Sequence, residues 1–384
     1  MPNNNLIYLD NNATTRLDDR VLEAMLPYFS EYYGNAASTH HFGKSINKIV
    51  DESRRKIADF IGCKPKELIF TSGATESINL ALKGLAFHYQ DKKNKIITVA
   101  TEHKAVLDTC KYLEQIGYEI IILKTDRNGL VDLDDLRDKV DKYTLCVCVM
   151  LANNETGVIQ PIEEISKIAH QQGALMVCDA TQAVGKIPVN VHQIWVDLLA
   201  FTGHKFYGPN GIGALYIRQG LQLSTSTHGG RHERGFRSGT LNVPNIVGLR
   251  TACENSISEM TDYHEHISEL RDYLEKNLLK VNGAFVNGNI ESRMYNVTNI
   301  SFPNVDANVL IQQVKQIAIS NGSACTSAVF EPSHVLKAMG LTNEEAFGAI
   351  RFSIGKYNTF EDIDQALEIL SQYLPFEYKS IFRK

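Results

Sequence analysis

Lys205 and Asp179 each follow a short apolar stretch of the chain, at a point where a charged side chain needs a specific partner. Lys205 lies in AFTGHKFYGPNG, beside Thr202, His204 and several glycines, and Asp179 ends the apolar run of VCDATQAVGK. An ionised carboxylate at the end of a buried strand is costly unless a cation or a hydrogen-bond donor pairs with it. Taken singly, Lys205 is explained as a surface lysine and Asp179 as a helix cap, so their function depends on what lies near them.

The stretch FTSGATESINLAL (70–82) predicts a binding site for an anion. An apolar strand ends there, a turn containing glycine follows, and a helix begins with Glu76 in its first turn. The free N–H groups of a helix start attract a phosphate, and a glycine lets the backbone approach it closely; Thr75 adds a hydroxyl. The stretch does not match the nucleotide-binding fingerprints, and by itself an ordinary capped helix also explains it. Combined with a lysine and a buried aspartate, it favours pyridoxal phosphate, whose chemistry uses a lysine Schiff base and a carboxylate at the ring nitrogen.

Three further polar positions follow predicted strands. His103 in EHKAV is placed to transfer protons or to stack on a flat cofactor, although a plain loop histidine is an equal alternative. Asn153 and Asn154 in LANNETG suit a cofactor or a substrate carboxylate, but Asn and Gly also favour an ordinary turn. Arg351 interrupts the apolar run GAIRFSI, where a buried guanidinium needs an anion. A substrate carboxylate or a structural ion pair would serve equally.

Cys325 lies in SNGSACTSAVFEP (320–332), where small polar residues offer the thiol little apolar surface. The other six cysteines occupy apolar or helical surroundings, and we expect them to be core thiols: Cys63, Cys110, Cys146, Cys148, Cys178 and Cys253. The sequence contains no C-x-x-C pair and no histidines at zinc spacing, so no metal site is expected. Cys325 is therefore the one cysteine that core packing does not explain.

The elements that must position these residues alternate between short apolar strands and amphipathic helices. Seven strands are predicted, at 67–72, 95–101, 118–124, 144–151, 175–181, 198–204 and 213–218. Strands that are apolar on both faces indicate a largely parallel sheet covered by helices, in which ligands bind at the carboxyl ends of the strands. The sequence thus predicts an α/β fold, with a large domain over 16–245 and a smaller α+β domain formed by 1–15 and 246–384.

The smaller domain is expected to begin with a long helix from about residue 247 to about residue 280. Strands near 297–302 and 316–321 and helices over 308–315 and 361–374 follow. Helices over 105–116 and 162–173 belong to the larger domain.

The composition suits a large globular enzyme. The chain has 384 residues, 43% of them hydrophobic, and a formal net charge of −5, which gives no bulk reason for binding nucleic acid or a membrane surface. The first residues, MPNNNLIYLDNNATT, lack the basic and apolar segments of a signal peptide, and no apolar run is long enough to span a membrane. We therefore expect a cytoplasmic protein.

Taken together, the motifs resemble those of the NifS/IscS-type cysteine desulfurases, which are fold type I pyridoxal-phosphate enzymes of the aminotransferase class V superfamily. The resemblance extends over nearly the whole chain, through YLDNNATT, GATES, EHKAV, NNETG, DATQAVGKIPV, GHK, RSGTLNVP and GSACTSAVFEPSHVL. Because these motifs occur in order over most of the sequence, the resemblance is highly specific.

The resemblance implies a role for each matching position. Lys205 would be the Schiff-base lysine and the proton carrier, Asp179 would pair with the pyridinium nitrogen, and Gln182 would reach the ring oxygen. His103 would stack on the ring, Cys325 would be the nucleophile, and Asn154 and Arg351 would hold the substrate carboxylate. The remaining cofactor-binding residues, most of them at the phosphate, would be Ala74, Thr75, Thr202, His204 and, from the neighbouring subunit of a homodimer, Thr240.

The resemblance also implies the reaction and its partners. L-Cysteine would be converted to L-alanine, leaving a persulfide on Cys325 for a sulfur acceptor in iron–sulfur cluster assembly, tRNA thiolation or DNA phosphorothioation. Direct contact with nucleic acid or a membrane is not expected. A selenocysteine lyase is the main alternative. An aminotransferase has no use for the thiol, and an inactive adaptor protein would not keep every catalytic position filled.

Overall fold

The central element of the molecule is a seven-stranded sheet, seen in a computed structural model that describes residues 6–90, 92–322 and 331–380. Its strands run in the order β2-β8-β7-β6-β5-β3-β4. In chain order they are β2 (Leu68–Thr71), β3 (Lys95–Val99), β4 (Glu119–Leu123), β5 (Thr144–Met150), β6 (Leu175–Asp179), β7 (Leu198–Thr202) and β8 (Gly213–Ile217). Neighbours from β4 through β7 pair in parallel, and β8 pairs antiparallel with both β7 and β2. The predicted seven-stranded, largely parallel sheet and the α/β fold class are confirmed.

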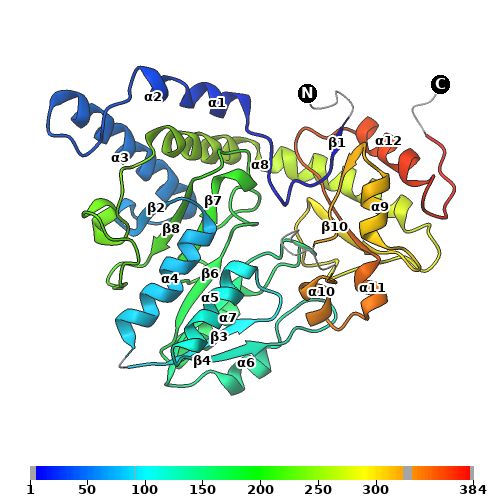
Figure 1. Cartoon of the computed structure of the whole chain (residues 1–384), viewed down its shortest axis with the longest axis horizontal. Helices are drawn as coiled ribbons and strands as arrows, with labels where there is room; N and C mark the ends of the chain where they lie inside the picture. Colours follow the sequence, from blue (N-terminus) through cyan, green and yellow to red (C-terminus); the bar gives the residue numbers. More distant parts are fainter. Residues whose placement is uncertain (1–5, 91, 323–330, 381–384) are drawn as a thin grey trace.

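Both faces of this sheet are buried, which explains the continuous apolar strands. Along β5, Cys146 and Cys148 point into one hydrophobic cluster, whereas Val147 and Val149 point into another, because successive strand residues face opposite sides. One face is covered by α4 (Ala74–Tyr89) and α5 (Lys104–Gln115). The other is covered by α3 (His41–Ile61), α6 (Leu133–Lys139), α7 (Ile162–Gln171) and the first part of α8 (Val243–Leu278). Figure 1 shows this layered arrangement.

A second hydrophobic cluster lies beside the large sheet. It is built on a three-stranded sheet, β12-β10-β9, and a two-stranded sheet, β1-β11. The strands are β1 (Ile7–Tyr8), β9 (Phe285–Val286), β10 (Val297–Ser301), β11 (Ile317–Ala318) and β12 (Ala349–Ser353). They pack with α9 (Ala307–Gln313), α12 (Phe360–Leu370) and the second part of α8.

Helix α8 connects the two cores, and Figure 1 shows it running below α1 and α2 from the left part of the molecule to the right. Ile246 and Leu249 belong to the core of the large sheet, whereas Ile267 and Leu270 belong to the second core. The helix starts four residues before the predicted position, because Asn242 caps it and Pro244 fits its first turn. Since one helix serves both cores, the division into domains near residue 245 stays a prediction.

The remaining elements are short. They are α1 (Asp19–Met25), α2 (Pro27–Ser30), α10 (His334–Ala338), α11 (Asn343–Phe347) and the 3-10 turns η1 (Pro65–Glu67), η2 (Gly203–Lys205) and η3 (His232–Gly235). The six cysteines other than Cys325 are free and buried, which confirms them as core thiols. Within the described ranges, no helix is long and apolar enough to cross a membrane.

Candidate active site

An open cavity with a volume of about 620 Å3 lies at the carboxyl ends of the parallel strands. Its walls come from the ends of β2, β5, β6 and β7, from the segment after β1, and from residues of the second core. Ten of the predicted site residues line it: Ala74, Thr75, His103, Asn154, Asp179, Gln182, Thr202, His204, Lys205 and Arg351. Thr240 is exposed and does not line the cavity of this single chain. Cys325 lies outside the described residues, between Gly322 of the cavity wall and Glu331.

One end of the cavity is formed by the turn between β2 and α4. Gly73 is the N-cap of α4 and has no side chain to cap it. The first amide groups of the helix therefore face the cavity without a side-chain hydrogen-bond partner from the N-cap residue. The turn is held by the Thr71 hydroxyl, which lies 2.8 Å from Ser77 Oγ. Strand β8 passes so closely that a Cβ on Gly213 would lie 2.7 Å from the Gly73 Cα. This end therefore has the backbone geometry of an anion site.

Thr202 and His204 stand on the same side of the cavity, after β7. Thr202 donates its hydroxyl hydrogen to the Ile212 carbonyl at 2.9 Å, so donation to a phosphate would require that hydrogen to turn away. His204 Nδ1 lies 3.1 Å from Thr14 Oγ1. Burial, together with the charge of Lys205, lowers the pKa of His204 to about 4. The ring is neutral at pH 7 and can donate one hydrogen bond.

Lys205 ends the 3-10 turn η2 that follows β7, so the predicted strand over 198–204 stops two residues early and the turn directs the lysine into the cavity. Its amine donates to the backbone carbonyls of Asn12 and Ala13 at 2.7 and 2.6 Å. Burial and the charge of Arg351 lower the pKa of Lys205 to about 8. A depressed pKa makes an unprotonated, nucleophilic amine available near neutral pH.

Asp179 lies at the end of β6 and His103 four residues after β3, the two strands that flank β5. Asp179 is the last residue of β6, is 5% exposed, and accepts a hydrogen bond from the Thr181 amide at 2.9 Å. His103 caps α5 by accepting from the Ala105 amide at Nδ1, 3.0 Å away. In its neutral form His103 therefore carries its proton on Nε2, the nitrogen left for contact with a ligand.

Arg351 enters the cavity from β12. One of its nitrogens donates to Asp10 at 2.6 Å and another to the Asn154 carbonyl at 3.0 Å. The structural ion pair considered from the sequence is thus present, and the partner is Asp10. Within the described part of the chain, the buried Nε of Arg351 has no partner. The guanidinium is therefore held in place with its Nε donor unused.

Asn12 connects these groups, although the sequence analysis gave it no role. Its backbone carbonyl accepts from Lys205 and from Gln182, and its side chain donates to the Asn154 carbonyl at 3.1 Å. The Asn12 side-chain oxygen accepts a hydrogen bond from the Lys186 amine. Lys186 is only 6% exposed, and its burial lowers its pKa well below the usual value. The signal for Asn12 and Asp10 was the polar run DNNATT directly after an apolar strand. Lys186 carried no comparable signal.

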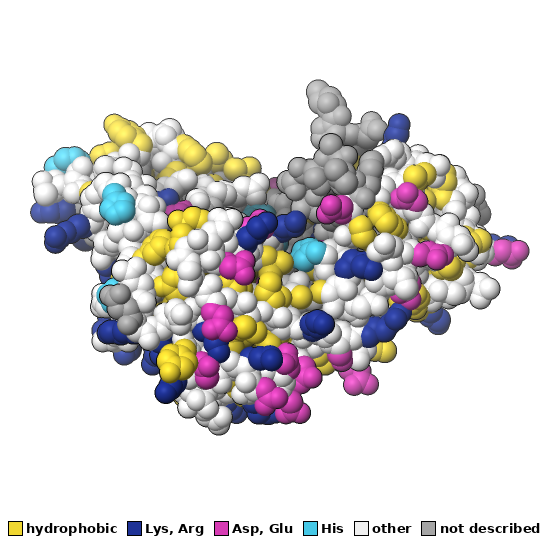
Figure 2. All heavy atoms as spheres, turned by 60° about the horizontal axis from the view of Figure 1, so that its bottom comes forward, with side chains coloured by type: hydrophobic (Ala, Val, Ile, Leu, Met, Phe, Trp, Pro, Cys, Tyr) yellow, Lys and Arg dark blue, Asp and Glu magenta, His cyan; other side chains and the backbone are white. Residues whose placement is uncertain are grey.

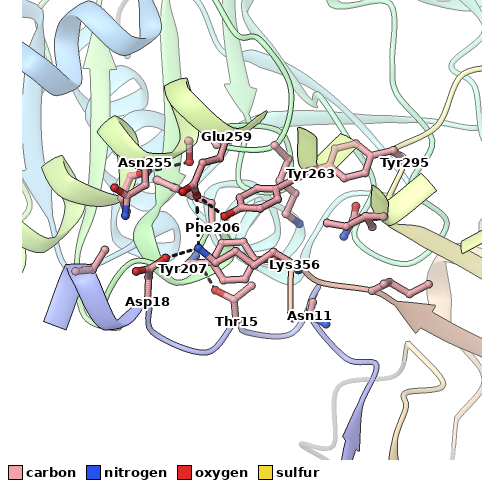
Figure 3. A pocket seen from close by; sticks show the side chains of 18 residues that line it. Asn11, Thr15, Asp18, Phe206, Tyr207, Asn255, Glu259, Tyr263, Tyr295 and Lys356 are labelled. Carbon is pink, nitrogen blue, oxygen red and sulfur yellow. Dashed lines mark hydrogen bonds and ion pairs between the residues drawn. The ribbon is translucent and has the colours of Figure 1, made fainter. Parts of the chain in front are cut away.

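The turn after Lys205 is fixed by a cluster of side chains around a second cavity of about 20 Å3 (Figure 3). The Lys356 amine lies 4.4 Å from the centre of the Tyr207 ring and pairs with Asp18. The Lys356 amide donates to the Tyr207 hydroxyl at 2.7 Å, and Glu259 of α8 lies 3.9 Å from the amine. This cluster ties the turn of Lys205 to α8 and to the segment after β12.

The residues present fit pyridoxal phosphate. A helix start with neighbouring hydroxyl and imidazole groups suits its phosphate, Asp179 suits its ring nitrogen, and Lys205 suits its aldehyde. Arg351 provides a cation for an amino-acid carboxylate. Among the residues that the structure describes, no group of three or more His, Cys, Asp or Glu side chains is placed to hold a metal ion.

The chain is similar to known proteins over nearly its whole length. The cysteine desulfurase IscS of Pectobacterium carotovorum is 46% identical over 369 residues, covering 95% of this chain and 91% of that protein. A solved NifS-like protein is 41% identical with a TM-score of 0.90, covering 96% of this chain and all of that one. The structure of SspA in complex with cysteine is 35% identical with a TM-score of 0.82, covering 92% of this chain and 99% of that one. Residues 7–366 match the aminotransferase class-V family, and the chain therefore belongs to that family.

Proposed function

We propose that this protein is a pyridoxal-phosphate-dependent cysteine desulfurase that converts L-cysteine to L-alanine and leaves a persulfide on Cys325. The observation that carries the proposal is the composition of one cavity, which combines an anion site, Asp179, Lys205 and Arg351. The wall of this cavity includes Gly322, three residues before Cys325. The names of the relatives support the same activity.

The cofactor would be held at three points. Ala74, Thr75, Thr202 and His204 would bind its phosphate, Lys205 would bind its aldehyde carbon, and Asp179 would keep its ring nitrogen protonated. His103 would lie against the ring, and Gln182, whose amide already donates to Asn12 at 2.9 Å, would approach the ring oxygen. When bound, the cofactor withdraws electrons from the α-carbon of an amino acid, which makes the α-proton acidic.

The protein groups would then orient the substrate and move its protons. Arg351 and Asn154 would bind the substrate carboxylate, and the unused Nε of Arg351 supports this role. Lys205 would take the α-proton, because its lowered pKa leaves part of the amine neutral near pH 7. His103, with its proton on Nε2, would donate a proton to the reacting groups.

The sulfur step transfers one sulfur atom to the enzyme. The thiolate of Cys325 attacks the substrate sulfur, an S–S bond forms, and the C–S bond of the substrate breaks. The electron pair of that bond goes to the substrate carbon, which is protonated and leaves as L-alanine. Cysteine and the enzyme thiol thus give alanine and an enzyme persulfide, with no other reactant. The persulfide then passes its outer sulfur to an acceptor.

The homodimer proposal rests on two surface features. Thr240 is exposed and lies outside the cavity of its own chain, in the loop that follows η3; we propose that the partner subunit's Thr240 reaches the phosphate. Exposed apolar side chains also gather on and after α1 and α2, along the upper edge of the left lobe in Figure 2: Leu22, Leu26, Phe29, Tyr32 and Tyr33. Residues 35–37, which follow the apolar group, and Leu241, next to Thr240, line one cavity, so the chain segments that carry the two features approach each other there.

The sulfur acceptor is identified only by its chemical class: we propose a protein that offers a nucleophilic thiol to the persulfide. Iron–sulfur cluster assembly, tRNA thiolation and DNA phosphorothioation are the pathways consistent with such a donor. The cytoplasmic location expected from the sequence stays a prediction. Selenocysteine is the alternative substrate, and comparing alanine formation from both amino acids decides between them.

The test is the variant Cys325→Ala, with Cys253→Ala, a buried core thiol, as the matched control. Cys325→Ala should keep the visible absorbance of the bound cofactor and its change on adding L-cysteine, yet form no alanine in a single turnover. Cys253→Ala should form alanine and acquire a persulfide on Cys325, detected by mass. Alanine formation by Cys325→Ala at the wild-type rate would contradict the proposal.

A further inference from the structure

Glu155 is a buried carboxyl group in the turn after β5, directly beside the proposed substrate residue Asn154. It is 1% exposed, and its amide donates to the Asn153 side chain at 2.8 Å. Its carbonyl faces the Asn299 side chain of β10 at 3.4 Å. The backbone of Glu155 is therefore fixed from both sides, and its side chain has a defined direction.

That side chain contacts both ends of the segment that carries Cys325. On the far end, the Ser333 hydroxyl donates to Glu155 Oε2 at 2.5 Å. On the near end, Gly322 has a φ of +79°, and a Cβ built there would lie 2.2 Å from the same oxygen. The backbone conformation of Gly322 favours glycine, and a side chain there would also push against Glu155. A single carboxyl oxygen thus lies against both residues, which are eleven positions apart in sequence.

The same two ends are tied to the walls of the cavity. Ser320 exchanges backbone hydrogen bonds with Arg351, one at 2.6 Å and one at 3.3 Å. His334 donates to the carbonyl of Glu102, next to His103, at 3.0 Å. The residues before and after the Cys325 segment are therefore connected to the two groups proposed to act on the substrate.

Burying the Glu155 carboxyl group costs folding stability, so its presence here needs an explanation. Burial raises the pKa of Glu155 to about 7, against the opposing effects of the Ser333 hydrogen bond and the Arg351 charge. Glutamine or an apolar residue would avoid burying an ionisable group here. The carboxyl oxygen Oε2 accepts the hydrogen bond from Ser333 and lies against Gly322, so one side chain contacts both segments.

We propose that Glu155 is a positioning residue for the sulfur step, because it holds both ends of the Cys325 segment against the cavity wall. Glu155 itself does not line the cavity. This inference rests on the proposed function, since it assigns Glu155 to the step in which Cys325 attacks. Loss of the anchor should slow that step while cofactor and cysteine binding remain normal, because the binding groups keep their own contacts.

The experiment compares Glu155→Ala, Glu155→Gln and Ser333→Ala in the holoenzyme. Ser333 also caps α10, because its hydroxyl oxygen accepts a hydrogen bond from the Leu336 amide at 3.2 Å. The control is therefore Thr342→Ala, which removes the equivalent cap of the equally short helix α11 and leaves Glu155 untouched. Two quantities are measured with L-cysteine: the dissociation constant from the change in cofactor absorbance, and the rate of alanine formation in a single turnover.

Glu155→Ala should lower the single-turnover rate by about 10-fold or more, since small displacements of a reacting group cost this much. Ser333→Ala should lower it less, Glu155→Gln should recover most of the rate because the amide oxygen can still accept from Ser333, and Thr342→Ala should match the wild type. The dissociation constant should stay unchanged in all four. A wild-type rate in Glu155→Ala, or equal losses in Ser333→Ala and Thr342→Ala, would overturn the proposal.

A second readout needs neither cofactor nor turnover. The rate at which iodoacetamide alkylates Cys325 should change in Glu155→Ala and Ser333→Ala and remain at the wild-type value in Thr342→Ala. If the wild-type protein forms no alanine, the proposed function is wrong, and the alkylation rates alone decide whether Glu155 anchors the segment. Unchanged alkylation in both variants would show that it does not.

Discussion

The two walls of the cavity hold their functional side chains in different ways. On the wall formed by the large sheet, Thr202, Lys205 and Asp179 all bond to backbone groups. On the opposite wall, Arg351 donates to the Asp10 side chain as well as to the Asn154 carbonyl. Glu155, which does not line the cavity, accepts from the Ser333 side chain. Backbone partners belong to strands and turns that cannot move alone, whereas side-chain pairs can exchange partners.

This difference suits two kinds of ligand. A permanent group such as a cofactor is best bound by positions that the fold fixes, since its site must be identical in every turnover. A substrate that enters and leaves can instead bind a group whose other partner is a side chain, and Arg351 has such a partner in Asp10. Experiments that change the sheet wall should therefore abolish cofactor chemistry, and those that change the other wall should alter substrate binding and rates.

The largest effect should come from Lys205→Ala on the sheet wall. Without its amine the protein cannot hold pyridoxal phosphate covalently, so the visible absorbance of the bound cofactor should be lost and alanine formation should be undetectable. The control is Lys104→Ala, an exposed lysine beside His103, which should retain both. A normal cofactor spectrum in Lys205→Ala would show that Lys205 does not bind the cofactor.

A smaller effect, confined to the substrate, should follow Arg351→Ala on the opposite wall. The KM for L-cysteine should rise by about 10-fold or more, because a charge-assisted hydrogen bond to the carboxylate is lost. The cofactor spectrum should persist.

Arg293→Ala is the matched control for Arg351→Ala, because Arg293 forms a comparably buried ion pair with Glu275 away from the cavity. It should cost about 3–5 kcal/mol of stability and leave KM unchanged. An unaltered KM in Arg351→Ala would show that Arg351 does not bind the substrate carboxylate and acts only through its ion pair with Asp10.

The sheet wall was predictable from sequence because its residues follow apolar strands at fixed positions. Asp179 and Lys205 were found in this way, and the seven strands confirm the arrangement. The other wall was less predictable. Arg351 stood out as a charge in an apolar strand, but its partner Asp10 lies 341 positions away in sequence, and only the folded chain brings the two together.

Glu155 was missed for the same reason. In NNETG it reads as one more polar residue of a turn, and nothing local indicates that it is buried or that residues 322 and 333 reach it. Lys186 was likewise missed, since a lysine before IPV suggests a surface position, whereas its amine bonds Asn12 and Gln182 inside the protein. Contacts that cross between segments distant in sequence carry no local signature.

The walls also meet electrostatically at Lys205, which gives a prediction on pH. Because the pKa of Lys205 is lowered to about 8, the neutral amine should be roughly a tenth of the total at pH 7 and roughly nine tenths at pH 9. The rate at which cofactor-free protein binds pyridoxal phosphate should therefore rise through pH 8 and level off. A rate that keeps rising tenfold per pH unit beyond pH 9 would indicate an ordinary lysine.

The smallest predicted effect separates the two charges on the opposite wall. Arg351 lowers the pKa of Lys205, and Asp10 raises it. Asp10→Asn should therefore move the midpoint of that pH profile downward, whereas Arg351→Ala should move it upward, each by a fraction of the total shift because burial is the larger cause. Opposite displacements would show that the substrate wall tunes the amine of the cofactor wall. Displacements of the same sign would mean that the variants act by changing burial instead.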